Sequence, residues 1–319
     1  MAGKGPPWWR VRPRMQEAEK GTLAAGAARP MLGAFMPMHP STLALIHAAI
    51  AEDVGPGDVT SEYFIPADSR SKAQIVAREP GVVAGMEVVE EVFRQIDPQI
   101  EVKPLIADGQ PFEPQSILLE ARGSTRSLLT AERTALNFLQ RLCGVATQAR
   151  RYVEAVKPHP VEVWDTRKTT PGWRLLEKAA VKCGGGTNHR MGLYDHAMVK
   201  DNHHAANPSL EALQANIRRL RAERPGVRVQ LEAASLQQVR DFLTLEGVDM
   251  LLLDNMSVPQ LREAVQLVNR RLWLEASGGI TLDTIREVAA TGVNAISVGA
   301  LTHSARALDL ALDILSEDA

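Results

Sequence analysis

The 319-residue sequence has few cysteines, almost no net charge and no long apolar run. Its two cysteines, Cys143 and Cys183, lack both the CxxC spacing of a redox pair and the Cys and His pattern of a zinc site. Lys and Arg number 36 and Asp and Glu 38, so no general attraction to nucleic acid or to an anionic membrane is expected. No apolar run approaches the roughly 20 residues of a membrane helix. We therefore expect a soluble protein of the reducing cytoplasm without a nucleic-acid or membrane partner.

Residues 1–40 are rich in Gly, Pro and Ala and show no sustained periodicity. We predict that they form a flexible N-terminal extension outside the fold. Arg29 and Pro30 interrupt the stretch that most resembles a signal-peptide core. The pattern changes at Ser41, because this residue can cap a helix with one apolar face.

Residues 41–146 mix strand and helix patterns. Alternating apolar residues predict a strand at 73–77 and another at 117–121, whereas a period of 3.6 predicts a helix at 86–96. A longer helix is expected at 127–142. This part of the chain is therefore predicted to be an α and β domain.

After residue 146, short apolar strands alternate with amphipathic helices. This βα alternation predicts a parallel sheet that is buried on both faces. No glycine-rich dinucleotide motif follows the first strand, so the pattern favours a closed barrel over an open doubly wound sheet. The expected strands are 161–164, 196–200, 227–232, 249–254, 272–276 and 294–299.

Polar residues follow almost every one of these strands, and in a barrel the strand ends converge on one mouth. Loops are polar in general, but this accounts poorly for Asp254, a carboxylate that directly follows the run 251–253 of three leucines. The strand-end residues are Asp165, Arg167 and Lys168; Lys200, Asp201 and Asn202; Glu232; Asp254 and Asn255; Glu275 and Ser277 to Gly279; Ser297 and Gly299.

Four cations and one histidine lie in or between the first two of these strand ends: Arg167, Lys168, His189, Arg190 and Lys200. Packed cations repel one another, so the cluster predicts an anionic ligand. Arginine offers a planar fork for carboxylate or phosphate, and lysine offers a point charge.

The glycine-rich segment 183–190 allows two interpretations, a flexible connector or backbone brought close to a ligand. His203 and His204 are adjacent, and no distant Cys or His completes a zinc site. We therefore do not predict zinc.

The later strands carry a different set of residues. Glu232 and Asp254 can accept hydrogen bonds from sugar hydroxyls or hold a hydrated Mg²⁺. Glycine-bearing turns ahead of helices can cradle phosphate. Together these features predict a phosphosugar across the late strands. The turn residues are Ser277, Gly278 and Gly279, followed by Ser297, Val298 and Gly299.

Six stretches carry a resemblance to a known family, in order along the chain from about Ser41. They read EDVGPGDVT (52–60), AERTALNFLQRLCGVAT (131–147), DTRKTTPGWRLLEKAAVKCGGGTNHR (165–190), MVKDNH (198–203), LLLDN (251–255) and EASGGI (275–280). The sequence resembles the quinolinate phosphoribosyltransferases, also called nicotinate-nucleotide pyrophosphorylases (carboxylating).

The resemblance implies an N-terminal α/β sandwich at 41–146 and an incomplete α/β barrel at 147–301. A C-terminal helix at 302–319 is expected to pack back on the first domain. It also implies a Mg²⁺-dependent homodimer, or an assembly of dimers, in which one subunit completes the site of its neighbour. The implied reaction converts quinolinate and phosphoribosyl pyrophosphate to nicotinate mononucleotide, pyrophosphate and CO₂, in de novo NAD synthesis.

The resemblance also implies roles for individual residues. Arg167, His189 and Arg190, with Thr166 beside them, match the binders of the quinolinate carboxylates. Arg133 matches an arginine contributed across the dimer interface. Lys168 and Lys200 match lysines between the two substrates, and Glu232 and Asp254 match carboxylates that serve the ribose and Mg²⁺, the metal through water. The turns at 277–279 and 297–299 resemble phosphate loops.

Two other functions are compatible with parts of the pattern. Lys168 or Lys200 could form a Schiff base in a barrel aldolase, which borohydride would trap on lysine. A non-catalytic phosphosugar-binding barrel would be favoured if the TRK, NHR or VKDN motifs were broken, and all three are intact.

Overall fold

The computed structural model describes residues 38–206 and 209–316, so nearly all of the predicted N-terminal extension lies outside the described residues. The first helix, α1 (Pro40–Val54), begins one residue before Ser41. Ser41 is not its cap, because the ring of His39 accepts from the Ser41 amide at 3.2 Å. Proline at the first helical position suits this start, since its missing N–H would have no partner there.

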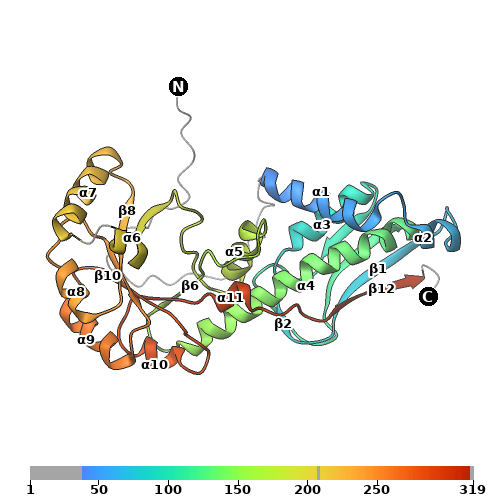
Figure 1. Cartoon of the computed structure of the whole chain (residues 1–319). Helices are drawn as coiled ribbons and strands as arrows, with labels where there is room; N and C mark the ends of the chain where they lie inside the picture. Colours follow the sequence, from blue (N-terminus) through green and yellow to red (C-terminus); the bar gives the residue numbers. More distant parts are fainter. Residues whose placement is uncertain (1–37, 207–208, 317–319) are drawn as a thin grey trace, which may run out of the picture. The chain divides into compact units, whose positions relative to one another are not determined.

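Four strands in the described part of the chain form an antiparallel sheet in the order β12-β1-β5-β3 (Figure 1). Buried Ala73 and Ile75 alternate with Lys72, which lies on the other face and pairs with Glu120 at 2.6 Å. One face therefore packs inward and the other carries charge. The strands are β12 (Leu310–Ser316), β1 (Arg70–Ala77), β5 (Ile117–Ser124) and β3 (Glu101–Pro104).

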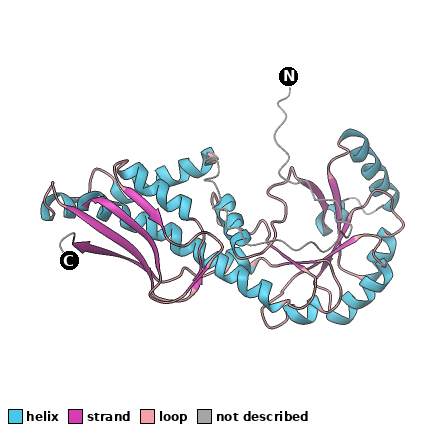
Figure 2. Cartoon of the chain, turned by 180° about the vertical axis from the view of Figure 1, so that it is seen from behind, coloured by secondary structure: helices cyan, strands magenta, loops and turns pink. Residues whose placement is uncertain are grey.

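Helices cover the inner face of this sheet, as Figure 2 shows from behind. α3 and α4 pack against each other, and α4 contacts β1, β5 and β12. Ile75, Phe93 and Phe138 are almost fully buried between the two layers. The elements of this region are α2 (Val59–Phe64), β2 (Gly81–Val82), α3 (Met86–Ile96), β4 (Pro111–Phe112) and α4 (Thr125–Ala155).

Helix α4 is about twice as long as predicted from the sequence, with 31 residues. Gly144 does not end the helix. A Cβ at this position would lie 1.8 Å from the Arg306 carbonyl oxygen, so glycine is needed for close packing against the chain after α11 (Ala300–His303). The apolar stripe continues to Tyr152. As a result, the predicted domain boundary after residue 146 falls inside a helix.

The predicted C-terminal helix is wrong, because residues 310–316 form strand β12. In this segment Leu310, Leu312 and Ile314 recur with a period of two, which suits a strand. β12 pairs antiparallel with β1, and Ile75 lies opposite Leu312.

A second sheet of six parallel strands has the order β6-β11-β10-β9-β8-β7 within the described residues. All six expected strands are present, but the predicted closed barrel is wrong, because β6 and β7 are the two edges of the sheet. The incomplete barrel implied by the family resemblance is confirmed. The strands are β6 (Glu162–Trp164), β7 (His196–Val199), β8 (Arg228–Ala233), β9 (Met250–Asp254), β10 (Trp273–Ser277) and β11 (Ala295–Ser297).

The segment before β7 lies along the free edge of β6. Thr187 donates its amide to the Val163 carbonyl at 2.8 Å and accepts from the Asp165 amide at 3.1 Å. This single parallel bridge ends the sheet without a seventh strand. It also places the NHR motif beside the loop that follows β6.

Helices surround the parallel strands (Figure 1). α5 also contacts α4, where Phe138 stacks on Trp173 with 4.8 Å between ring centroids. No helix in ranges 38–206 and 209–316 is long and apolar enough to span a membrane. The helices are α5 (Arg174–Cys183), α6 (Asp201–Ala206), α7 (Leu210–Glu223), α8 (Leu236–Phe242), α9 (Val258–Val268), α10 (Ile285–Ala289) and α11.

Candidate active site

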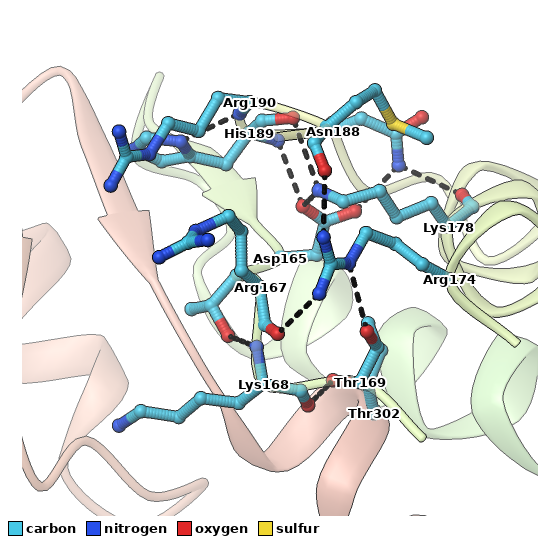
Figure 3. A network of polar contacts seen from close by, with 12 residues as sticks. Asp165, Arg167, Lys168, Thr169, Arg174, Lys178, Asn188, His189, Arg190 and Thr302 are labelled. Carbon is cyan, nitrogen blue, oxygen red and sulfur yellow. Dashed lines mark hydrogen bonds and ion pairs between the residues drawn. The ribbon is translucent and has the colours of Figure 1, made fainter. Parts of the chain in front are cut away.

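A fully buried carboxylate stands at the end of β6 and joins the TRK loop to the NHR segment (Figure 3). Asp165 accepts from the Lys178 ammonium, from the His189 amide at 2.8 Å and from the Asn188 side chain at 2.6 Å. The Lys178 ammonium also donates to the His189 carbonyl at 3.1 Å. Two segments far apart in the sequence are thereby held together by one buried ion pair.

Burial disfavours the charged forms of both Asp165 and Lys178. It raises the pKa of Asp165 and lowers the pKa of Lys178, while the attraction between the two groups opposes both shifts. Lys178 is only 1% exposed. A buried pair of this kind is costly to form and is even more costly to break on one side.

Arg174, at the start of α5, ties the same two segments together from another direction (Figure 3). Its guanidinium donates to the Thr169 hydroxyl at 3.1 Å, to the Met191 carbonyl at 3.0 Å and to the Arg167 carbonyl at 3.4 Å. Side chains of α5 therefore hold both the TRK loop and the segment around the NHR motif.

A third contact fixes the end of the TRK loop. Glu177, which is fully buried on α5, accepts from the amide of Thr170 at 3.0 Å and from its hydroxyl at 2.8 Å. Arg141 of α4 donates to the same carboxylate at 2.7 Å and to the Thr302 carbonyl at 2.5 Å. The loop is thus anchored on both α4 and α11.

Arg167 and Arg190 are brought close together by this framework. Burial and the neighbouring Arg167 guanidinium lower the pKa of Arg190. Arg190 donates to the His196 carbonyl at 3.3 Å, whereas within the described residues the Arg167 guanidinium has no hydrogen-bond or ion-pair partner. In Figure 3 it extends away from the network. Two partly buried guanidiniums side by side form a site for an anion.

Lys168 extends from the same loop towards the turn that follows strand β11. Its carbonyl accepts from the Thr302 hydroxyl at 2.8 Å, and its amide donates to the Thr166 hydroxyl at 3.0 Å. A Cβ on Gly299 would lie 3.0 Å from Lys168 Cδ. The structure therefore brings the predicted early cations and one of the late glycine turns together.

The ring of His189, which the resemblance places among the binders of the quinolinate carboxylates, contacts protein groups in this structure. Its Nδ1 accepts from the Arg190 amide at 2.7 Å, and its Nε2 lies 3.1 Å from the Glu275 carboxylate. The imidazole stands edge-on to Trp164 at 5.2 Å between centroids. Both ring nitrogens are thus engaged within the protein.

The carboxylates at the ends of β8 and β9 form a second charged group. Lys200 donates to Glu232 at 2.6 Å. Burial and the charge of Glu232 raise the pKa of Asp254, with Asp201 acting in the same direction. The described residues contain no group of three or more His, Cys, Asp or Glu placed to hold a metal ion.

The two late turns differ in what they leave available to a ligand. Gly278 has φ of 99°, and a Cβ there would lie 2.2 Å from the Asn255 side-chain oxygen. The helix expected directly after this turn begins only at Ile285. In the other turn, the Val298 amide already donates to the Trp164 carbonyl at 2.9 Å, while Gly299 precedes α11 directly.

Gly278→Ala is expected to reduce stability by about 1–3 kcal/mol, because alanine is strained at positive φ and its Cβ would clash with Asn255. Thermal unfolding of the variant measures the loss. Gly226→Ala is the matched control, since nothing lies within 4 Å of a Cβ at that position. Equal melting temperatures for the two variants would contradict the expectation.

Arg133 lies on the exposed surface of α4, and its side chain is 58% exposed. The ion-pair contact it makes is to its neighbour Glu132, at 3.7 Å. It precedes Arg141 by about 12 Å along the helix axis. Arg133 is therefore placed apart from the Arg141 contacts that anchor the TRK loop.

Sequence reasoning missed the residues that hold the site together: Arg141, Arg174, Glu177, Lys178 and Asn188. A signal for two of them was present. Glu177 and Lys178 lie three residues before Ala180 and Val181, and thus on the same buried stripe of α5. Charged residues on an apolar stripe need partners, which the sequence alone does not supply.

Comparison with known proteins agrees with this architecture. Residues 58–143 match the N-terminal domain of quinolinate phosphoribosyl transferase, and residues 145–313 match its C-terminal domain. The rice chloroplastic nicotinate-nucleotide pyrophosphorylase [carboxylating] is 39% identical over 97% of this chain and 86% of its own length. A probable enzyme of the same name from Bacillus subtilis is 38% identical over 85% of this chain and 92% of its own.

A solved structure shows the same likeness. The nicotinate-nucleotide pyrophosphorylase from Francisella tularensis superposes with a TM-score of 0.80 at 34% identity, covering 86% of this chain and 96% of that one. The chain belongs to the quinolinate phosphoribosyltransferase family.

Proposed function

We propose that this chain is a glycosyltransferase that converts quinolinate and phosphoribosyl pyrophosphate to nicotinate mononucleotide, pyrophosphate and CO₂, a step of NAD biosynthesis. The observation that carries the proposal is the pair of Arg167 and Arg190, in which one guanidinium has no protein anion within the described residues. Quinolinate offers two adjacent carboxylates, which match two adjacent guanidiniums. Relatives with this activity in their names support the same reaction.

In the proposed reaction, the pyridine nitrogen forms a bond to C1 of the ribose while the bond from C1 to pyrophosphate breaks. The carboxylate carbon next to the new pyridinium then leaves as CO₂. The electron pair stays on the ring carbon, stabilised by the adjacent positive nitrogen, until that carbon takes a proton. Arg167 and Arg190 hold the carboxylates, with Thr166 beside them, and Lys168 and Lys200 lie between the two substrates. Correct placement of the two substrates contributes to the rate enhancement in this scheme.

The residues at the ends of β8 and β9 fit a hydrated Mg²⁺. Glu232 and Asp254 are close enough for their charges to interact, because the charge of Glu232 contributes to the raised pKa of Asp254. Mg²⁺ keeps several waters and needs only one or two carboxylates when phosphates complete its shell. Glu232 and Asp254 would hold it through water, and when bound it would neutralise charge on the departing pyrophosphate.

The late turns are proposed to bind the phosphate groups of phosphoribosyl pyrophosphate. Lys168 supports this placement, since its side chain runs beside Gly299 and its backbone is held by Thr302. The positive φ of Gly278 supports close approach of backbone to ligand. The proposed phosphate-binding residues are Ser277, Gly278, Gly279, Ser297, Val298 and Gly299.

The direct test incubates the purified protein with quinolinate, phosphoribosyl pyrophosphate and Mg²⁺. Release of ¹⁴CO₂ from quinolinate labelled in the carboxyl group next to the ring nitrogen, in equal amounts with nicotinate mononucleotide, is the expected result. Omitting phosphoribosyl pyrophosphate is the control. Turnover of nicotinate with no turnover of quinolinate would overturn the proposal.

We also propose a homodimer, or an assembly of dimers, in which Arg133 serves the site of the other subunit. The exposure of Arg133 supports this role. Arg133→Ala and Arg190→Ala are each expected to be nearly inactive, whereas a mixture is expected to regain about a quarter of wild-type activity. Random mixing makes half of the dimers mixed, and each mixed dimer has one intact site.

This rescue is measured after the two variants have exchanged subunits, which mass spectrometry of a tagged chain would verify. Absence of rescue despite exchange would contradict a shared site.

A cytoplasmic location is proposed as well, supported by Cys143 and Cys183, which are free thiols.

A further inference from the structure

All the polar atoms of His189 have partners within the chain. Its amide donates to Asp165 at 2.8 Å, and its carbonyl accepts from Lys178 at 3.1 Å. Its ring Nδ1 accepts from the Arg190 amide at 2.7 Å, and its ring Nε2 lies 3.1 Å from Glu275. A residue held at four atoms has little capacity left for a ligand.

These contacts define one protonation state of the ring. A backbone N–H can only donate, so Nδ1 of His189 must be unprotonated. Nε2 therefore carries the proton and donates to Glu275. Although burial opposes it, hydrogen bonds from His189 and from Ser297 and Gln230 lower the pKa of Glu275 and keep it ionised as an acceptor. The ring of His189 is thus neutral.

The surroundings of the ring leave little surface for substrate. The side chain of His189 is 5% exposed. Trp164 stands edge-on to the ring, and His196 lies 5.1 Å away between centroids. Burial and the charge of Arg190 lower the pKa of His196 to about 4, so this second ring is neutral too. His196 in turn contacts Gln230 at 3.1 Å.

Glu275 contacts both His189 and Gln230 in the interior of the parallel sheet domain. It is 1% exposed in the middle of β10 and also accepts from Gln230 of β8 at 2.5 Å. Through His189 it is linked to the Arg190 amide, and the Arg190 side chain runs from there to the His196 carbonyl. The direction of Arg190 therefore depends on a carboxylate that is two contacts away.

We infer that His189 and Glu275 are positioning residues, which fix Arg190 for the quinolinate carboxylate, and that the His189 ring does not itself bind the substrate. This inference rests on the proposed function for the identity of the anion. It assigns the direct contacts to the two guanidiniums and gives the neutral ring the task of holding the Arg190 backbone.

The first test observes the tautomer of His189 directly, in the complete protein labelled with ¹⁵N-histidine. Long-range ¹H–¹⁵N spectra should show a bare Nδ1 and a protonated Nε2 for His189, unchanged at saturating quinolinate. The His189→Gln variant assigns the signals. Protonation of both nitrogens, or a change of tautomer on adding quinolinate, would overturn the inference.

The second test separates positioning from direct contact by kinetics. Loss of one charge-assisted contact in Glu275→Ala should raise KM for quinolinate about 10-fold, while KM for phosphoribosyl pyrophosphate changes less than about 2-fold. Glu162→Gln is the matched control, because Glu162 lies on β6 in the same row as Ala295 and Glu275 but is exposed. It should leave both constants unchanged.

A double-mutant cycle identifies the residue through which Glu275 acts. Because Arg190→Ala is expected to be nearly inactive, the cycle is measured as the equilibrium dissociation constant of quinolinate. If Glu275 acts through Arg190, Glu275→Ala should raise this constant by less than about 2-fold in an Arg190→Ala background. A full 10-fold cost in that background would contradict the inference. Glu275→Gln, which keeps the shape of the side chain, repeats the cycle if the alanine variant folds poorly.

The tests also distinguish this inference from the proposed function. A wild-type protein without activity on quinolinate would refute the function, whereas the tautomer of His189 in the ligand-free protein would still be measured. A protein that is active but has a doubly protonated His189 would refute the inference alone.

Discussion

Lys178→Met is expected to lower the free energy of unfolding by about 3–5 kcal/mol, because it leaves Asp165 as a buried, unpaired charge. Asp165 and Lys178 are 0% and 1% exposed, so water cannot replace the lost ammonium. The same change releases the His189 carbonyl and with it the NHR segment. Most activity should be lost along with stability. Urea unfolding, followed by fluorescence or circular dichroism, measures the change.

Two further variants make this expectation specific. Lys182→Met removes the same charge from an exposed position of α5 and should change stability by less than about 0.5 kcal/mol. The double variant Asp165→Asn with Lys178→Met removes both buried charges and should recover part of the stability, but not the activity. Equal losses in Lys178→Met and Lys182→Met would contradict a structural role for the buried pair.

Arg167→Ala is expected to lose much of its activity with little loss of stability, unlike Lys178→Met, which should lose both. Its guanidinium has no protein partner within the described part of the chain, and it lies near a second cation, Arg190. Two hydrogen bonds to a carboxylate contribute roughly 1.5–3 kcal/mol each, so kcat/KM for quinolinate should fall by about 10²–10⁴. The free energy of unfolding should change by less than about 0.5 kcal/mol.

The controls for this variant test charge against geometry. Arg167→Lys keeps the charge but loses the planar fork, so its kcat/KM should fall between those of alanine and the wild type. Arg262→Ala removes an exposed arginine on α9 and should leave activity unchanged. A loss of stability in Arg167→Ala as large as that in Lys178→Met would show that Arg167 is structural.

Much of the fold was predictable because hydrophobic periodicity reports the local environment of each segment. All six parallel strands and the first helix of the chain were expected from it, with small differences in their bounds. The length of α4 and the last strand were not. Gly144 reads as a break in a helix, although its lack of a side chain serves packing against Arg306. Leu310, Leu312 and Ile314 have the period of two of a strand, but Leu308, Leu312 and Leu315 have a helical spacing as well. Pairing with β1 decides between the two.

The cations at the strand ends of the site could be predicted from the sequence. Arg167, Lys168, Arg190 and Lys200 follow strands or glycine-rich segments, so their convergence follows from parallel-strand topology. The buried charged residues that support the site could not be predicted, because Lys178 and Glu177 look like ordinary helix residues until their partners are known. His189 shows the difference most clearly, since only the structure reveals that both of its ring nitrogens are already engaged.

The parallel strands, the cations at their ends and, through the motifs, the family could be identified from the sequence alone. These properties are local, and each is encoded in a few neighbouring residues. The fold was needed to show that β6 and β7 are the open edges of the incomplete barrel, that the C-terminal segment is a strand, and that Asp165, Lys178 and Glu275 hold the cation-bearing segments. Each of those outcomes depends on a partner distant in sequence, and a charged side chain is stable in the interior only where such a partner meets it.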